Sequence, residues 1–201
     1  PDMATMLAFL ATDLAVRPDV LDVLLKRAVD ASFNRITVDG DTSTNDAVVC
    51  VAAGTDGDID DADGPRGRAL GAALTEACVQ LAQAIVRDGE GATRFVAVEV
   101  AGGRDRAEAL ACAYTIAQSP LVKTALFAGD PNWGRILAAV GRAGMEDLDT
   151  DTVDLRIADT LTGDEVLVAE GGGVAASYRE EDGARIMTAV ELALRVDLGR
   201  G

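Results

Sequence analysis

Hydrophobic and polar residues follow one another along the chain in blocks whose lengths fit strands and helices. Residues 5–16 (TMLAFLATDLAV) form an almost uninterrupted apolar run, which predicts a strand buried on both faces. Residues 17–36 predict a helix that begins near Pro18, because apolar side chains recur there every three or four positions: Val20, Val23, Leu24, Ala28 and Ala31.

Further blocks of both kinds continue to about residue 145. Residues 39–46 predict a polar turn before a second apolar run, and residues 55–67, rich in Asp and Gly, predict a solvated loop. Residues 68–91 predict the clearest helix, with one apolar stripe made of Leu70, Leu74, Ala77, Leu81 and Ile85.

The remaining pattern sets the expected fold class. Residues 93–103 and 120–129 predict strands, and two helices are predicted to begin at the capping residues Asp105 and Asp130. The last fifty residues predict mostly strands. The alternation indicates an α/β fold, a layered sandwich of helices and mixed sheet. We expect an α/β domain over residues 5–145 and a strand-rich region over residues 146–201.

The composition excludes several classes of partner. The chain carries 34 acidic against 18 basic residues, a net charge of −16 over 201 residues. Such a surface disfavours nucleic acid and anionic membranes as partners. No uninterrupted apolar run approaches the roughly 20 residues that a membrane span needs, and no signal peptide is visible at the start. We therefore expect a cytoplasmic protein.

Histidine is absent from the chain, which limits the available chemistry. A Ser-His-Asp or Cys-His triad and a His-ligated zinc site are excluded, and we expect no metal. A general base must then be a carboxylate, a lysine, a tyrosine or a terminal amine. The cysteines, Cys50, Cys78 and Cys112, lie far apart in apolar stretches, so reduced, buried thiols are expected rather than disulfides.

Three polar motifs have both a structural and a functional interpretation. The stretch DGDTSTND (39–46) is typical of turns but could bind a polar substrate. The stretch GDPNWGR (129–135) is typical of a capped helix but could place a helix N-terminus against an anion. Glu90, between two glycines after a helix, is typical of solvated surface but could contact a substrate.

The pair Ala4-Thr5 stands directly before the first strand, where Thr5 is either an ordinary strand residue or a nucleophile. An N-terminal threonine carries its own base, because an α-amine has a pKa near 7.7–8.0 and is partly neutral at working pH. This amine exists only if the bond between Ala4 and Thr5 is cut. The absence of histidine favours this chemistry without establishing it.

Several motifs together resemble one family. PDMATMLAFLATD, DGDTSTND, GEGATR, SPLVKTALFAGDPNWGRILAAVG and VDLGRG occur in the order found in the ornithine acetyltransferase family, also called glutamate N-acetyltransferases. The resemblance covers nearly all 201 residues. It implies the self-cleaving fold of that family, with residues 1–4 as the end of an α chain and Thr5 as the first residue of a β chain.

The resemblance also implies a reaction and its residues. Family members transfer acetyl from N-acetylornithine to glutamate, releasing ornithine and N-acetylglutamate, through an acetyl ester on the threonine that matches Thr5. Glu90, in GEGATR, matches a substrate-binding position. No cofactor is implied, although some members also accept acetyl-CoA. The implied partner is the α chain of the same precursor, in an αβ oligomer such as a heterotetramer.

Two departures from the family keep other interpretations open. The α half, which supplies the oxyanion hole in the family, is missing, and the chain stops at VDLGRG, before the family's C-terminal substrate residues. One rival is a self-processing N-terminal-nucleophile hydrolase, which would pass the acyl group to water. The other is an uncleaved, inert fragment.

Overall fold

The computed structural model describes residues 6–42 and 45–201, and the chain divides into two compact units. The first unit ends at Glu90 and the second runs from Gly91 to Gly201. The boundary expected after residue 145 does not coincide with this division. The reason is that the last strand of the chain pairs with residues 95–101, which places the strand-rich C-terminal residues in the same sheet as the middle of the chain.

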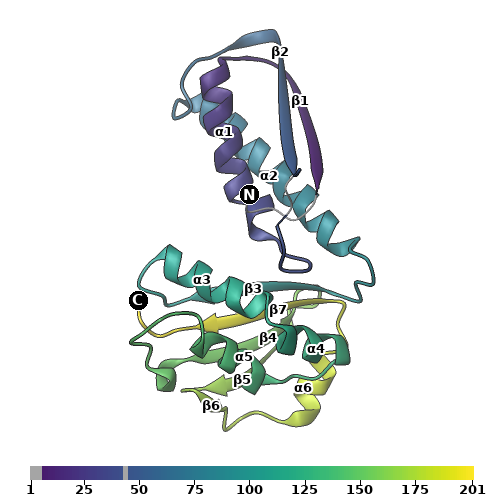
Figure 1. Ribbon diagram of the computed structural model, residues 1–201, viewed down its shortest axis with the longest axis vertical. Helices are drawn as coiled ribbons and strands as arrows, with labels where there is room; N and C mark the ends of the chain where they lie inside the picture. Colours follow the sequence, from purple (N-terminus) through teal and green to yellow (C-terminus); the bar gives the residue numbers. More distant parts are fainter. Residues whose placement is uncertain (1–5, 43–44) are drawn as a thin grey trace. The chain divides into compact units, whose positions relative to one another are not determined.

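The first unit is a β-α-β arrangement with a second helix. Strands β1 (Leu7–Val16) and β2 (Ala47–Ile59) are parallel neighbours, and helices α1 (Pro18–Asp30) and α2 (Pro65–Arg87) pack on one face of the pair (Figure 1). A short 3-10 turn, Phe33–Arg35, follows α1. Parallel strands need such a crossover connection, and α1 supplies it.

The core of this unit confirms the two predicted helices and refines their buried faces. Val20, Leu24 and Ala28 of α1 are buried as predicted, whereas Val23 is partly exposed. In α2 the buried positions are Gly67, Leu70, Leu74, Cys78 and Ala82, so the stripe is rotated from the predicted one and Leu81 is exposed. Strand β2 also extends to Ile59, through residues predicted as loop, because they pair with the end of β1.

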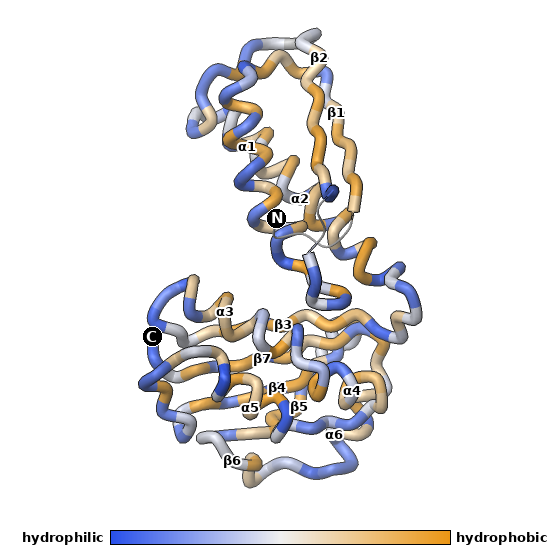
Figure 2. The backbone as a smooth tube through the Cα atoms, viewed as in Figure 1, coloured by the Kyte–Doolittle hydropathy of each residue, from blue (hydrophilic) through white to orange (hydrophobic). Residues whose placement is uncertain are grey.

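The other face of the β1–β2 pair is apolar, and its side chains are exposed within the described part of the chain. Leu7, Phe9, Val49 and Val51 point to this face, with exposed fractions of 65% for Leu7 and 73% for Phe9. Both strands are hydrophobic along much of their length (Figure 2). Parallel sheets are normally covered on both faces, so this face differs from an ordinary solvated surface.

The second unit is built on a five-stranded mixed sheet. Its order is β3 (Phe95–Ala101), β7 (Glu191–Asp197), β4 (Asp154–Asp159), β5 (Glu165–Glu170) and β6 (Gly173–Val174). Only the β3–β7 pair is parallel. The unit also contains helices α3 (Arg106–Ala117), α4 (Pro120–Ala128), α5 (Trp133–Gly141) and α6 (Glu180–Ile186), and the 3-10 turn Thr150–Thr152. The α/β class with a mixed sheet is confirmed.

Most strands of this unit were predicted, but α4 was predicted as a strand. The prediction for residues 120–129 is wrong because an apolar run this short does not separate a buried strand from a buried helix. The local signals for a helix are present. The Ser119 side chain accepts from the Val122 backbone N–H, Pro120 occupies the first turn, and Gly129 ends the helix with φ of 70°.

Of the helices described, α2 alone is long and apolar enough to cross a membrane by length and composition. Helices in the cores of soluble proteins meet the same criteria. Here one side of α2 packs against α1 in the core of the first unit.

Candidate functional site

Thr5 and Ala4, the predicted nucleophile and cleavage residue, lie outside the described residues. Met6, which is bonded to Thr5, is described and firmly held. Its side chain is buried, its carbonyl oxygen accepts from the Ala47 backbone N–H at 3.1 Å, and its own N–H donates to Asp46 Oδ1 at 2.7 Å. The strand therefore fixes the peptide nitrogen that follows Thr5.

Asp46 reaches this position through the pairing of the two strands. Leu7 pairs with Ala47 in the parallel register, so the residues just before them, Met6 and Asp46, are also neighbours. The second carboxylate oxygen, Oδ2, is buried and has no hydrogen-bond partner among the described residues. Asp46 is the last acid of DGDTSTND. The sequence offered it only as one of several turn residues, because nothing in the pattern showed which strands pair or in which register.

A hollow of about 450 Å³ lies beside the start of β1. Its walls come from the first residues of β1, the last two turns of α2 and Asp88, which follows α2. The lining residues are Leu7, Ala8, Phe9, Leu81, Ala84, Ile85 and Asp88. The lining is mostly apolar, and the volume lies in the range of small-molecule sites. The sequence did not predict it, because it depends on how α2 packs against β1.

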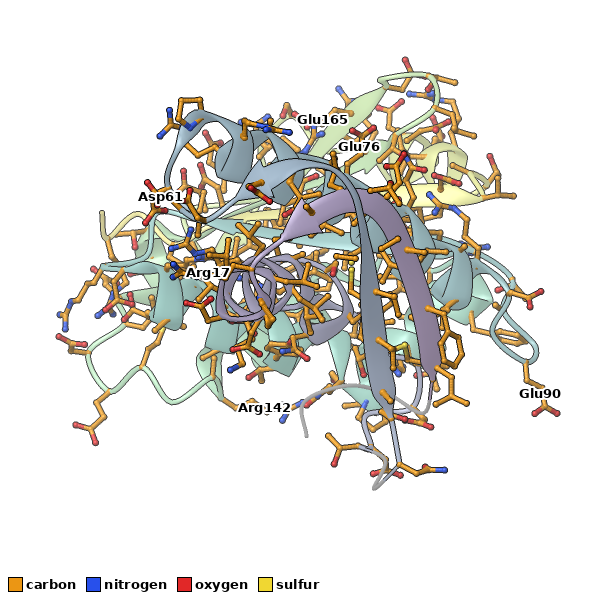
Figure 3. All side chains as sticks on the ribbon, turned by 90° about the horizontal axis from the view of Figure 1, so that it is seen from above. Arg17, Asp61, Glu76, Glu90, Arg142 and Glu165 are labelled. Carbon is orange, nitrogen blue, oxygen red and sulfur yellow. The ribbon has the colours of Figure 1, made fainter. Side chains whose placement is uncertain are left out.

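Glu90 lies on the turn that follows α2, as predicted, and its side chain is exposed. In Figure 3 it projects away from that turn. It follows Asp88 by two residues and therefore lies just beyond the residues that line the hollow. The structure thus brings the segment that precedes Glu90 and the segment that follows Thr5 to one hollow.

The motif GDPNWGR contains the N-terminus of helix α5, as predicted, but the capping residue differs from the predicted one. Asn132 Oδ1 accepts from the Arg135 backbone N–H at 3.1 Å and caps α5. Asp130, the predicted cap, instead accepts from Asn132 Nδ2 at 3.0 Å. The predicted cap lies two residues before the observed one, and the sequence did not separate them because Asp and Asn are both good caps. Asp130 therefore supports the capping residue.

The thiols are poorly suited to serve as nucleophiles. No disulfide joins them, and burial raises the pKa of all three, that of Cys112 to about 11. A nucleophilic cysteine needs a lowered pKa and access to solvent. Within residues 6–42 and 45–201, no group of three or more Cys, Asp or Glu side chains is arranged to hold a metal ion.

Comparison with known proteins identifies the family. A sequence profile described as the ArgJ family matches residues 1–201, the whole chain. The chain belongs to the ArgJ family. The expected resemblance is confirmed, since the names of the relatives place the family in arginine biosynthesis.

The similar proteins span different lengths. The arginine biosynthesis bifunctional protein ArgJ of Pseudomonas fluorescens (strain Pf0-1) is 52% identical over 203 residues, which covers 100% of this chain and 49% of that protein. The protein of the same name from Psychrobacter arcticus is 51% identical, with 100% and 48% covered. This chain therefore spans about half the length of these curated relatives.

A crystal structure of ArgJ from Bacillus halodurans matches the fold. The TM-score is 0.88 at 37% sequence identity, and the match covers 98% of this chain and 90% of that chain. The chain in that crystal structure is thus close to this one in length, whereas the curated relatives are about twice as long.

Proposed function

We propose that this chain is the nucleophile-bearing part of a glutamate N-acetyltransferase of arginine biosynthesis. The observation that carries the proposal is the ArgJ match over all 201 residues, which includes Ala4-Thr5 and Glu90. Two features of the described residues support it. The peptide nitrogen next to Thr5 is held in place, and a hollow for a small molecule lies beside the same strand.

In the proposed reaction, Thr5 Oγ attacks the acetyl carbonyl of N-acetylornithine. The Thr5 α-amine takes the hydroxyl proton and passes it to the leaving nitrogen as the amide C–N bond breaks, so that ornithine departs. An acetyl ester remains on Thr5. The amine of glutamate then attacks the ester, N-acetylglutamate forms, and Thr5 Oγ regains its proton.

The free amine requires prior cleavage of the chain. In the proposed step, Thr5 Oγ attacks the carbonyl of Ala4, the acyl group shifts from nitrogen to oxygen, and water hydrolyses the resulting ester. The chain lengths support this step, because a single chain in the Bacillus halodurans crystal structure has roughly half the length of the curated proteins.

Glu90 is the proposed substrate-binding residue, with Thr5 itself as the second contact. A carboxylate is a suitable partner for the amino groups of ornithine, and charge-assisted hydrogen bonds of this type are strong. The turn is exposed and follows directly on the hollow, which supports an approach of Glu90 to a bound amino acid.

No cofactor is needed for this reaction, and acetyl-CoA is a candidate second donor. We place the reaction in the cytoplasm. The proposed partner is the α chain of the same precursor, in an αβ oligomer such as a heterotetramer. The open apolar face of β1–β2 supports such a partner, since exposed apolar faces of this kind mark interaction surfaces. The curated relatives contain a further half of chain that could cover it.

The test uses the full-length precursor, incubated with N-acetylornithine with and without glutamate. We expect N-acetylglutamate to form only when glutamate is present, and Thr5→Ala to abolish both the transfer and the fragment that begins at Thr5. If acetate is released from N-acetylornithine at the same rate with and without glutamate, the protein is instead a hydrolase. If the wild-type protein stays uncleaved and transfers no acetyl, and Thr5→Ala gives the same result, the chain is an inert fragment.

A further inference from the structure

Strand β1 lies at the edge of its sheet. Among residues 6–42 and 45–201 the only strand paired with it is β2, and the pair is parallel. Two strands alone are marginally stable, and parallel sheets are normally covered on both faces. Edge strands that face water usually carry charged residues or proline, which prevent further pairing. Residues 7–12 (LAFLAT) carry neither, so this edge is not protected against pairing with another strand.

The direction of the backbone groups shows which residues face this edge. Met6 directs both its N–H and its carbonyl oxygen toward β2, where Asp46 Oδ1 accepts at 2.7 Å and the Ala47 N–H donates at 3.1 Å. Successive residues of a strand are related by about half a turn, so their backbone groups point to alternate sides. Every second residue after Met6 therefore faces β2, and the residues between them direct their N–H and carbonyl groups to the free edge. These residues are Leu7, Phe9 and Ala11.

The hollow beside β1 lies along this same edge. All its lining residues come from β1, α2 and Asp88, and none comes from β2. On the helix side the lining includes Leu81, which is 42% exposed, and Ile85. In Figure 1 the last turns of α2 extend past β1, where no described strand covers them. A strand placed next to β1 would lie over this apolar part of α2.

We propose that a strand of the α chain pairs with the free edge of β1 and extends this sheet. The inference rests on the proposed function for its partner, the α chain, and adds the place and the mode of the contact. Main-chain hydrogen bonds at a sheet edge give affinity, and alternate side chains of the added strand pack on Leu81 and Ile85. The added strand forms the roof of the hollow, whose floor is α2. Both halves of the precursor then line the hollow.

The length of the relatives favours this occupant of the edge. This chain covers 49% and 48% of the two curated relatives, so each of them contains about as much chain again. The free edge also borders the apolar face to which Leu7, Phe9, Val49 and Val51 point. One partner can therefore pair with the edge and cover the face, which gives the parallel strands the burial on both faces that such sheets normally have.

Hydrogen exchange of the full-length protein, resolved at single amides, tests the pairing. We expect the amides of Phe9 and Ala11 to exchange at least about 100-fold more slowly than unprotected amides, because a strand hydrogen bond must open before exchange. The amides of Ala8 and Leu10, which face β2, are the internal reference and should be protected in either case. The inference is overturned if these two are protected while Phe9 and Ala11 exchange at unprotected rates.

Ala11→Pro separates a paired amide from one that is only covered. Proline lacks the N–H but is tolerated in edge strands where that N–H has no partner strand. We expect the dissociation constant between the cleaved halves to rise roughly tenfold, because a hydrogen bond is lost and the ring lies where the added strand runs. Ala11→Ser keeps the N–H and is the matched control, which should behave as wild type. Equal dissociation constants for both variants, with Ala8 and Leu10 still protected, contradict the pairing.

A second copy of the protein is the alternative occupant of the edge. If the protection of Phe9 and Ala11 disappears on dilution while the two halves of each precursor stay together, the strand comes from that second copy and the inference is wrong. Hydrogen exchange requires no acetyl transfer. A precursor that protects both amides but never transfers acetyl therefore supports the pairing and refutes the proposed function, so the two failures are distinguishable.

Discussion

At the scale of single residues, the sequence pointed to the proposed nucleophile Thr5 and the proposed substrate-binding residue Glu90, but not to Asp46, whose carboxylate accepts from the Met6 N–H. Thr5 and Glu90 became candidates through motifs, and the structure describes only Glu90 of the two. Asp46 could not be selected from DGDTSTND, because its contact with Met6 depends on the parallel register of two strands forty residues apart. Polar turn residues look alike in sequence until the pairing of their strands is known.

The role of Glu90 gives a prediction at this scale. We expect Glu90→Gln to raise KM for N-acetylornithine roughly 10- to 100-fold, since a hydrogen bond to a charged group contributes about 1.5–3 kcal/mol. The value of kcat should change much less, because the contact is made equally in the ground state and the transition state. Steady-state kinetics on the cleaved protein provide the measurement.

The control for this variant is Glu76→Gln, an exposed carboxylate on α2 that is not among the residues lining the hollow. Glu76→Gln should leave KM unchanged. Equal values of KM for both variants and wild type would remove Glu90 from the substrate site.

At the scale of elements, periodicity predicted long helices and strands well and failed for short apolar segments. Helix α2 has many residues over which its stripe repeats, whereas α4 has nine residues that are nearly all apolar. For such a segment the capping residues are the better guide, and Ser119, Pro120 and Gly129 mark both ends of α4. Helix α5, which begins within the motif GDPNWGR, likewise has its start marked by a capping residue, Asn132.

Loss of the α5 cap should destabilise the second unit. Asn132→Ala removes the acceptor for the Arg135 N–H, and we expect the free energy of unfolding to fall by about 1 kcal/mol. Chemical denaturation monitored by circular dichroism measures the change. Asp130→Ala, which loses only the contact to Asn132 Nδ2, should cost less. A larger loss for Asp130→Ala would mean that Asp130 is the cap after all.

At the scale of the whole molecule, the chain contains two units with separate cores, and the first has one uncovered apolar sheet face. The sequence indicated an almost fully apolar first strand, which predicts burial on both faces. Among residues 6–42 and 45–201, helices cover only one face of this strand pair. The curated relatives are about twice as long as this chain. If their additional half packs on the second face, the strand is buried on both faces in the whole protein, as its sequence predicts.

This explanation predicts that charge on the open face weakens the association with the other half. In the cleaved full-length protein, Val51→Asp should raise the dissociation constant between the halves by roughly tenfold or more, because a buried unpaired charge is costly. Analytical size exclusion over a dilution series measures it. Val174→Asp is the control, since both valines lie in strands and are similarly exposed, at 56% and 55%. Equal dissociation constants for the two variants would show that the β1–β2 face is not the contact.

The most direct test of the central claim is the intact-mass spectrum of the cleaved protein after mixing with N-acetylornithine in the absence of glutamate. We predict that the fragment beginning at Thr5 gains the mass of one acetyl group, which peptide mapping places on the Thr5 hydroxyl, and that glutamate removes it. N-acetylglutamate formed at full rate while that fragment never carries acetyl would contradict the account.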